Sequence, residues 1–209
     1  MKQRNKKIVA ITNDKLFGGH SFEGFVPMNR KNFWSRICQN HTLVNRRKAD
    51  KDRKIKQPVL FLVAYSPKQK KLFYFRPEEK PGEKDMLERK YSCGVCGHIK
   101  KIELKCNELH DLVYDFFDTK FTTSGARYIK PIGYINYEKT DFGKTHFGIV
   151  FLVTFDGKLT PLCPTLRTSD MISPLELDGF IDSGFPVDEW TKAIFPEIRK
   201  FFGNLNEER

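Results

Sequence analysis

The feature that most constrains the fold is a nearly continuous apolar run at residues 58–65, with the sequence PVLFLVAY. Its β-branched and aromatic residues, with no polar position between them, are typical of a central strand in a sheet. Residues 71–76 (KLFYFR) are expected to form the neighbouring strand. The polar residues between the two segments are suited to a hairpin loop. The sequence therefore predicts a sheet built around residues 58–65.

The clearest helix is expected at residues 107–121. Apolar residues recur there at three- and four-residue spacing and form one face, and Asn107 is placed to cap the helix start. Two more helices are expected near the end of the chain, one with Ser173 as N-cap and one broken at Pro196. The other expected elements are a helix at 30–39, strands at 7–12, 91–95, 126–136 and 146–155, a hairpin loop at 141–144, and the last two helices at 173–180 and 187–202.

The composition is that of a chain that can bury a core, since hydrophobic residues make up 39% of its 209 residues. The net charge of +11 favours anionic partners such as nucleotides, RNA or phosphorylated metabolites. A basic protein without such a partner is an equally open interpretation. No apolar run is long enough to span a bilayer and no secretory signal is visible, so a cytoplasmic protein with no membrane partner is expected.

Two of the five cysteines lie in a Cys-x-x-Cys spacing, at Cys93 and Cys96, with His98 close behind. With Cys106 and His110 they could supply the soft ligands of a zinc site. Against this, residues three apart on an extended strand point to opposite faces, and no second Cys-x-x-Cys is present. Two small buried thiols are therefore the favoured interpretation, and zinc is the disfavoured one.

Four motifs follow one another along most of the chain, from about residue 8 to residue 198. They are FEGF at 22–25, a segment at 46–57 that holds Arg46, Asp50 and Gln57, YSCGVCGHI at 91–99, and GYIN at 133–136 together with GKTHFGIVF at 143–151. This series resembles the Nudix hydrolases, and more narrowly their subfamily of predicted phosphoesterases.

The resemblance implies a Nudix-like α/β/α sandwich with a mixed sheet, within an α/β (α+β) fold. A single domain, 1–209, is expected, with residues 57–202 as the Nudix core and residues 1–56 as an N-terminal extension packed on it. The resemblance also implies hydrolysis of a pyrophosphate linked to a nucleoside or a related group, assisted by Mg²⁺ or Mn²⁺. Cations of this kind neutralise the linked phosphates and position the attacking water.

Nudix proteins hold the metal with acids on one face of a helix, and this chain keeps only part of that motif. Asp115 and Asp118 stand where the first two acids are expected, whereas Thr119 replaces the third. Glu103, Asp115 and Asp118 are the candidate catalytic residues, and Asp111, Asp115 and Asp118 are the candidate metal ligands. An ordinary solvated helix face is the alternative interpretation of these acids.

The candidate substrate-binding residues are Arg46, Arg76, His98 and His146. Guanidinium groups bind phosphate oxygens, and both histidines lie in matched motifs. Lys56 is a further candidate for holding phosphate. Two functions stay open: a pyrophosphohydrolase acting on a nucleotide-type small molecule, and a catalytically inactive Nudix-fold module that binds nucleotide or RNA through its basic surface.

Overall fold

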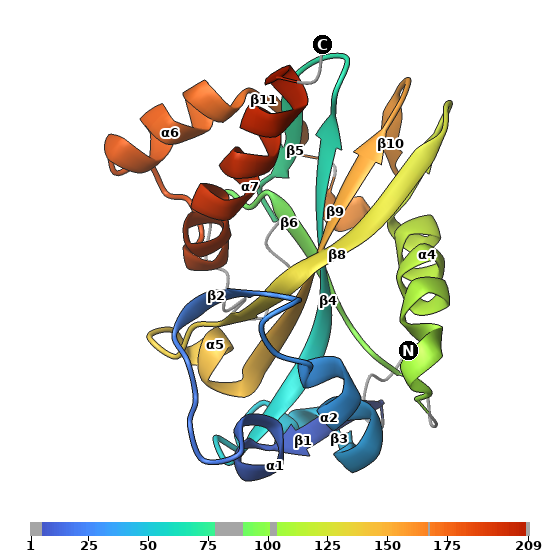
Figure 1. Cartoon of the computed structure of the whole chain (residues 1–209), viewed down its shortest axis with the longest axis vertical. Helices are drawn as coiled ribbons and strands as arrows, with labels where there is room; N and C mark the ends of the chain where they lie inside the picture. The colour runs from blue at the N-terminus through green and yellow to red at the C-terminus, as the bar shows by residue number, and fades with distance from the viewer. Residues whose placement is uncertain (1–5, 78–89, 101–103, 167, 208–209) are drawn as a thin grey trace.

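The computed structural model describes residues 6–77, 90–100, 104–166 and 168–207. Within these residues, a mixed sheet of nine strands forms the middle of the molecule, with helices on both faces (Figure 1). Helix α4 (Leu109–Lys120) lies on one side, and helices α6 (Pro174–Asp182) and α7 (Glu189–Glu207) lie on the other. The predicted α/β (α+β) sandwich around a mixed sheet is confirmed.

Strand β4 (Ile55–Ser66) contains the predicted central segment, and every residue after Ile55 is buried. It pairs in parallel with β9 (His146–Phe155), in a register that sets Gln57 opposite His146. The other strands of the sheet core pair antiparallel with these two. They are β5 (Lys71–Phe75), β6 (Gly94–His98) and β8 (Arg127–Asn136).

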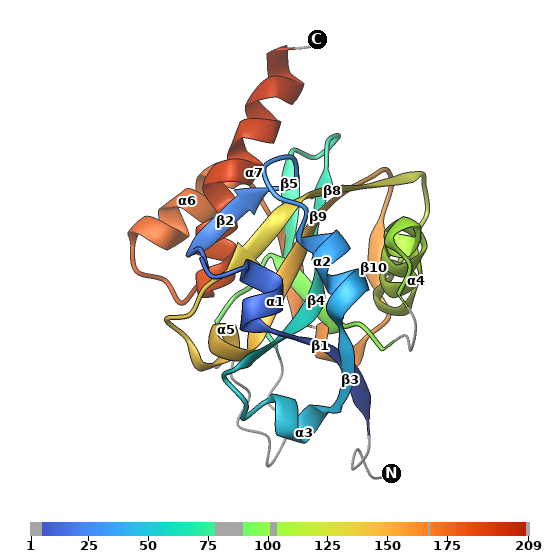
Figure 2. The same ribbon diagram turned by 60° about the horizontal axis from the view of Figure 1, so that its bottom comes forward.

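The first part of the chain adds strands to the same sheet. Strand β1 (Lys7–Thr12) pairs with both β3 (Thr42–Asn45) and the start of β4, and β2 (Gly24–Pro27) pairs with β8. Figure 2 shows β1 and β3 at the end of the molecule where β4 begins. The remaining strands are β7 (Phe121–Thr123), its partner β10 (Leu159–Pro161), and β11 (Ser169–Ile172), which pairs with β5.

The start of helix α4 differs from the prediction. Asn107 does not cap it, because the residue lies inside a 3₁₀ turn, η1 (Cys106–Glu108), that precedes the helix. Glu108 occupies the N-cap position without a capping side-chain hydrogen bond. Its carboxylate instead accepts a hydrogen bond from the backbone N–H of Lys105, at 3.2 Å.

Two expectations about the last third of the chain are wrong and one is confirmed. The segment expected as a hairpin loop forms a short helix, α5 (Asp141–Thr145), because Thr140 caps it. Helix α7 passes through Pro196 without a break, since Ile194 and Ile198 are both buried and packing outweighs the hydrogen bond that proline cannot make. Ser173 caps α6 as predicted.

The other helices are α1 (Asn13–Phe17), α2 (Phe33–Asn40), α3 (Arg46–Ala49) and the 3₁₀ turn η2 (Pro164–Leu166).

The sheet separates two hydrophobic clusters. On β4, Leu60 and Leu62 point into the cluster that includes Phe117 of α4, whereas Val59 and Phe61 point into the cluster that includes Trp190 of α7. This alternation is the two-residue periodicity of a strand. Among the described residues, no helix is both long and apolar enough to cross a membrane.

The packing of α4 on the sheet yields a stability prediction. Phe117 is fully buried, so replacing it with alanine leaves a cavity and should lower the free energy of unfolding by about 3–5 kcal/mol. The matched control is Tyr128→Ala, because Tyr128 is 62% exposed and its loss should cost well under 1 kcal/mol. Urea unfolding of both variants measures the difference. Equal losses would show that α4 is not docked as described.

Candidate functional site

The pairing of three strands brings His98 and His146 together. His98 ends β6 opposite Val59 of β4, and His146 begins β9 opposite Gln57. Paired residues share a face of the sheet, and positions two apart on a strand do too. The two Nε2 atoms consequently lie 3.1 Å apart, although 48 residues separate the histidines along the chain.

A chain of hydrogen bonds runs through this pair. The Gln57 side-chain amide donates to Asp50 Oδ1 at 3.1 Å, and Gln57 Oε1 lies 3.0 Å from His98 Nε2. At the other end, His146 Nδ1 lies 2.9 Å from the backbone carbonyl of Phe142. A carbonyl can only accept, so His146 carries its proton on Nδ1 and presents a lone pair on Nε2. His98 Nε2 therefore carries a proton and donates it toward Gln57 and His146.

Both imidazoles are held in the neutral form. Burial, together with the neighbouring His146 and Arg46, lowers the pKa of His98 from 6.5 to about 3. Burial likewise lowers the pKa of His146 to about 4, partly opposed by the hydrogen bond to Phe142 and by Asp50. At neutral pH the pair can donate and accept hydrogen bonds but carries no charge.

Lys56, a candidate for holding phosphate, is not available for that role. Its side chain is fully buried. The ammonium group donates to the Gly143 carbonyl at 2.7 Å and lies 2.9 Å from Glu138 Oε1. Burial lowers the pKa of Lys56, and the ion pair with Glu138 opposes that shift. Lys56 thus links the start of β4 to α5 through contacts inside the protein, and its charge is not presented to a substrate.

A group of cations lies beside the histidine pair. Arg46, the first residue of α3, reaches Asp50 with 3.9 Å between Nε and Oδ2, and its side chain is 47% exposed. Lys100, two residues beyond His98, is exposed. Partial desolvation lowers the pKa of its ammonium group, and the nearby positive charges of Lys6, Lys120 and Arg46 lower it as well. This part of the surface is therefore strongly electropositive.

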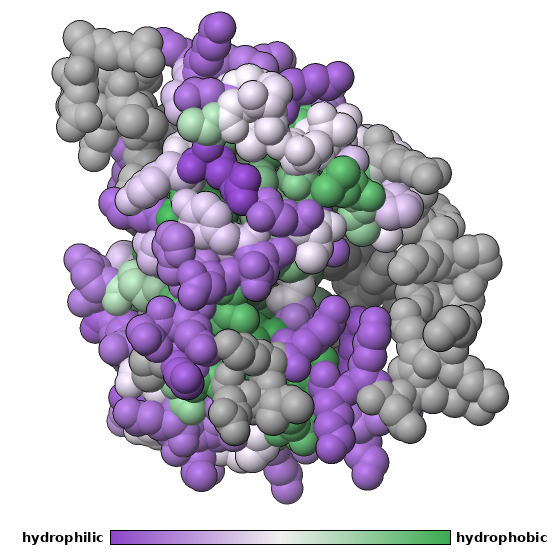
Figure 3. All heavy atoms as spheres, turned by 90° about the vertical axis from the view of Figure 1, so that its right-hand side faces the viewer, coloured by the Kyte–Doolittle hydropathy of each residue, from purple (hydrophilic) through white to green (hydrophobic). Residues whose placement is uncertain are grey.

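The candidate acids of α4 lie on the other face of the sheet from the histidine pair. Asp111, Asp115 and Asp118 are all exposed, and most of this side of the molecule is covered by hydrophilic side chains (Figure 3). Asp118 forms a 2.8 Å ion pair with Arg127. Phe116 packs directly against Gly97 of β6, where a Cβ would overlap the ring. Glu103 lies outside the described residues.

Within the described residues, one set of three His, Cys, Asp or Glu side chains could hold a metal ion. It consists of Asp50, His98 and His146, whose ligand atoms lie within 4.8 Å of one another. The acids of α4 form no such set. Asp50 and Gln57 were not predicted as site residues, although both lie in the motif segment just before the central strand. The available sequence signal was a polar glutamine directly before the apolar run at 58–65.

Two other candidates lie apart from this set. Arg76 follows β5, and its guanidinium sits 5.8 Å from the Tyr91 ring, at the opposite end of β6 from His98. Cys93 is fully buried, and burial raises its thiol pKa far above the ordinary value. Cys96 packs against the cluster that contains Cys93. Among the described residues, neither cysteine belongs to the group of side chains that could hold a metal ion.

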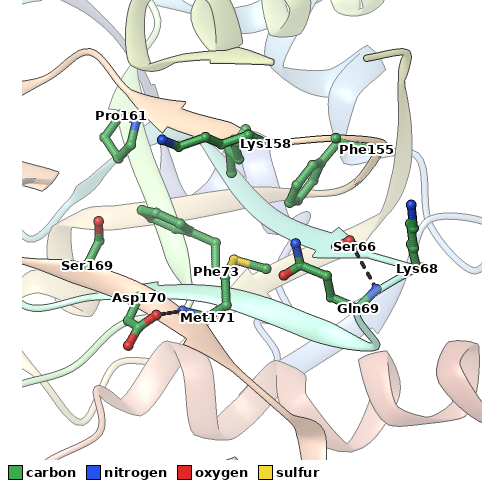
Figure 4. Close-up of a pocket in the computed structure, with 12 residues that line it drawn as sticks. Ser66, Lys68, Gln69, Phe73, Phe155, Lys158, Pro161, Ser169, Asp170 and Met171 are labelled. Atoms are coloured by element: carbon green, nitrogen blue, oxygen red, sulfur yellow. Dashed lines mark hydrogen bonds between the residues drawn. The ribbon is translucent and has the colours of Figure 1, made fainter. Parts of the chain in front are cut away.

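The structure also contains a cavity of about 680 Å³ at the far end of β4. Figure 4 shows the aromatic rings of Phe73 and Phe155 and the side chains of Lys68, Lys158 and Asp170 at its walls. The residues come from the β4–β5 hairpin, the turn after β9, and the start of β11. No sequence pattern predicted this cavity, because its walls meet only through sheet pairing.

The fold is that of the Nudix hydrolases. Tm1382, a candidate Nudix hydrolase of known crystal structure, superimposes with a TM-score of 0.74 over 93% of this chain and 99% of its own, at 19% identity. DR0079 from Deinococcus radiodurans gives a TM-score of 0.49 over 68% of this chain and 82% of its own, at 14% identity. No protein-family model matches the chain, and no curated protein matches its sequence.

The buried histidine pair predicts how stability depends on pH. Both pKa values are lower in the folded chain than the ordinary 6.5, so between about pH 6.5 and pH 4 the unfolded chain binds more protons. The free energy of unfolding should therefore fall as the pH drops through this range, by up to about 1.4 kcal/mol per pH unit for each histidine.

Urea unfolding at pH 7.5 and pH 5 tests this sign. The difference between the two pH values should shrink in His146→Gln, which removes one of the titrating groups. His110→Gln is the control, because it removes an exposed histidine that lies outside the pair. An undiminished difference in His146→Gln would contradict the neutral buried pair.

Proposed function

We propose that this protein hydrolyses a pyrophosphate linked to a nucleoside or a related group, with Mg²⁺ or Mn²⁺ bound at helix α4. The observation that carries the proposal is the likeness in fold to a candidate Nudix hydrolase over nearly the whole of both chains. At 19% identity this likeness concerns the fold, so the reaction is an inference from it together with the residues of the site.

The acids of α4 support a metal site with fewer carboxylate ligands than the Nudix motif provides. Asp111 and Asp115 are four residues apart and project from one helix face. Their carboxylates are the hard oxygen ligands that Mg²⁺ prefers. Asp118 would first have to leave Arg127, which makes it the weaker ligand. Glu103, outside the described residues, remains the predicted third acid.

The cations near the end of β6 support the binding of phosphates. Arg46 and Lys100 are exposed, and their charges add to those of Lys6 and Lys120. A cluster of this kind raises the local concentration of anions and can neutralise two linked phosphates. When bound, the metal would supply further charge neutralisation and a positioned water. His98 and His146 are neutral and lie on the other face of the sheet from α4, so they add no charge to this metal site.

A specific observation favours a second function, a non-catalytic module that binds nucleotide or RNA. Asp118 is neutralised by Arg127, and Phe116 fills the space over Gly97. The ion pair reduces the carboxylates available for metal, and the Phe116 ring fills space beside β6, while the basic surface is kept. In this alternative, affinity for RNA should fall steeply as salt is raised, and no turnover should be seen.

The deciding experiment is turnover of a panel of nucleoside diphosphate-linked compounds with Mg²⁺ or Mn²⁺. We expect product release from at least one compound, and we expect Asp115→Asn to reduce the rate about 100-fold or more, as loss of a group that stabilises the transition state does. Asp182→Asn is the matched control, because Asp182 is an exposed acid of α6 on the other side of the sheet.

Two results would count against the proposal. No turnover with any compound, together with salt-sensitive RNA binding, would favour the non-catalytic module. Turnover that survives in Asp115→Asn would place the reaction elsewhere than the acidic face of α4.

A further inference from the structure

We propose that Asp50, His98 and His146 form a second cation site, which binds a first-row divalent transition metal such as Zn²⁺. This site is separate from the acids of α4, because the sheet lies between them: Gly97, next to His98, faces Phe116 of α4, whereas Gly148, two residues after His146, faces Trp190 of α7. The inference does not depend on the proposed hydrolase function.

The distances fit one ion. The ligand atoms of the three side chains lie within 4.8 Å of one another, and the two Nε2 atoms are 3.1 Å apart. Imidazole nitrogens bind Zn²⁺ at about 2.0–2.1 Å, so two of them on one ion lie roughly 3 Å apart. The pair therefore already has the required nitrogen separation. An ion would replace the hydrogen bond between the rings, with the His98 proton carried on Nδ1 instead of Nε2.

The surroundings of His146 are those of a metal ligand. Its Nδ1–H donates to the Phe142 carbonyl at 2.9 Å, which fixes the ring and leaves the Nε2 lone pair directed at the cluster. Metal-binding histidines are commonly oriented by such a bond to a backbone carbonyl. The ring is also stacked on Phe142, with the centroids 3.9 Å apart.

The ligand types select the class of metal. Two imidazole nitrogens with one carboxylate suit zinc and other divalent first-row transition metals, whereas Mg²⁺ and Ca²⁺ prefer sites made of oxygen. Asp50 supplies the negative charge, and Gln57, hydrogen-bonded to both Asp50 and His98, offers another oxygen beside it. Arg46 lies 3.9 Å from the Asp50 carboxylate and opposes cation binding there.

The test is titration of the metal-stripped full-length protein with Zn²⁺, followed by calorimetry and without any substrate. We expect saturable binding of one equivalent at micromolar concentration. His98→Ala and Asp50→Asn should each weaken the binding at least about tenfold, since loss of a residue that merely orients a metal ligand already lowers metal affinity that much. His20→Ala, which removes an exposed histidine outside both candidate metal sites, should bind as the parent does. Circular dichroism of each variant establishes that it is folded.

Two more variants separate this site from its competitors. Arg46→Gln removes the opposing charge, so it should bind Zn²⁺ at least as tightly as the parent, whereas weaker binding would overturn the proposal. Cys96→Ser should have no effect, and loss of binding in that variant would assign the zinc to the cysteines instead. Absence of binding by the parent, or parent-like binding by both His98→Ala and Asp50→Asn, would also overturn it. None of these results depends on turnover, so they stand apart from the test of hydrolysis.

Discussion

The parallel pairing of β4 with β9 is the constraint on which the rest of this structure depends. Its register sets Gln57 opposite His146. The antiparallel pairing of β6 on the other edge of β4 then sets His98 opposite Val59. A shift of one residue in either pairing would turn a histidine to the opposite face. The register is secured because β4 is buried on both faces, so its side chains fit two different clusters.

The same alternation divides the candidate functional residues between two sides of the sheet. The acids of α4, which we propose as magnesium ligands, lie on the helix whose Phe116 packs on Gly97 of β6. The histidine pair lies on the side of α7, in contact with Phe142 of α5. Cations such as Arg46 and Lys100 lie near the end of β6. A substitution among the acids of α4 therefore need not disturb Asp50, His98 and His146.

Much of the fold could be predicted from the sequence, because burial leaves local patterns. The apolar run at 58–65 and the periodicity at 107–121 both correspond to observed elements. Helix continuation through Pro196 could not be predicted, since it depends on packing of the flanking residues against the sheet. The arrangement of the histidine site could not be predicted either, because it too depends on contacts between distant parts of the chain.

Motif matches indicated Arg46, His98 and His146 as functional candidates, but they did not indicate what the residues do together. That depends on strand register, which no local pattern carries. Asp50 and Gln57 stood in a matched segment without a role, and they gain one only when β4 and β9 are aligned. The Mg²⁺ or Mn²⁺ role of Asp111, Asp115 and Asp118 stays a prediction, as does the catalytic role of Glu103.

The most direct test of the histidine-pair account is anomalous X-ray diffraction from crystals of the full chain grown with Zn²⁺. We expect an anomalous peak about 2.0–2.1 Å from Nε2 of both His98 and His146, with the Asp50 carboxylate turned toward it. An anomalous peak at Cys93 and Cys96, or none beside the histidine pair, would contradict the account.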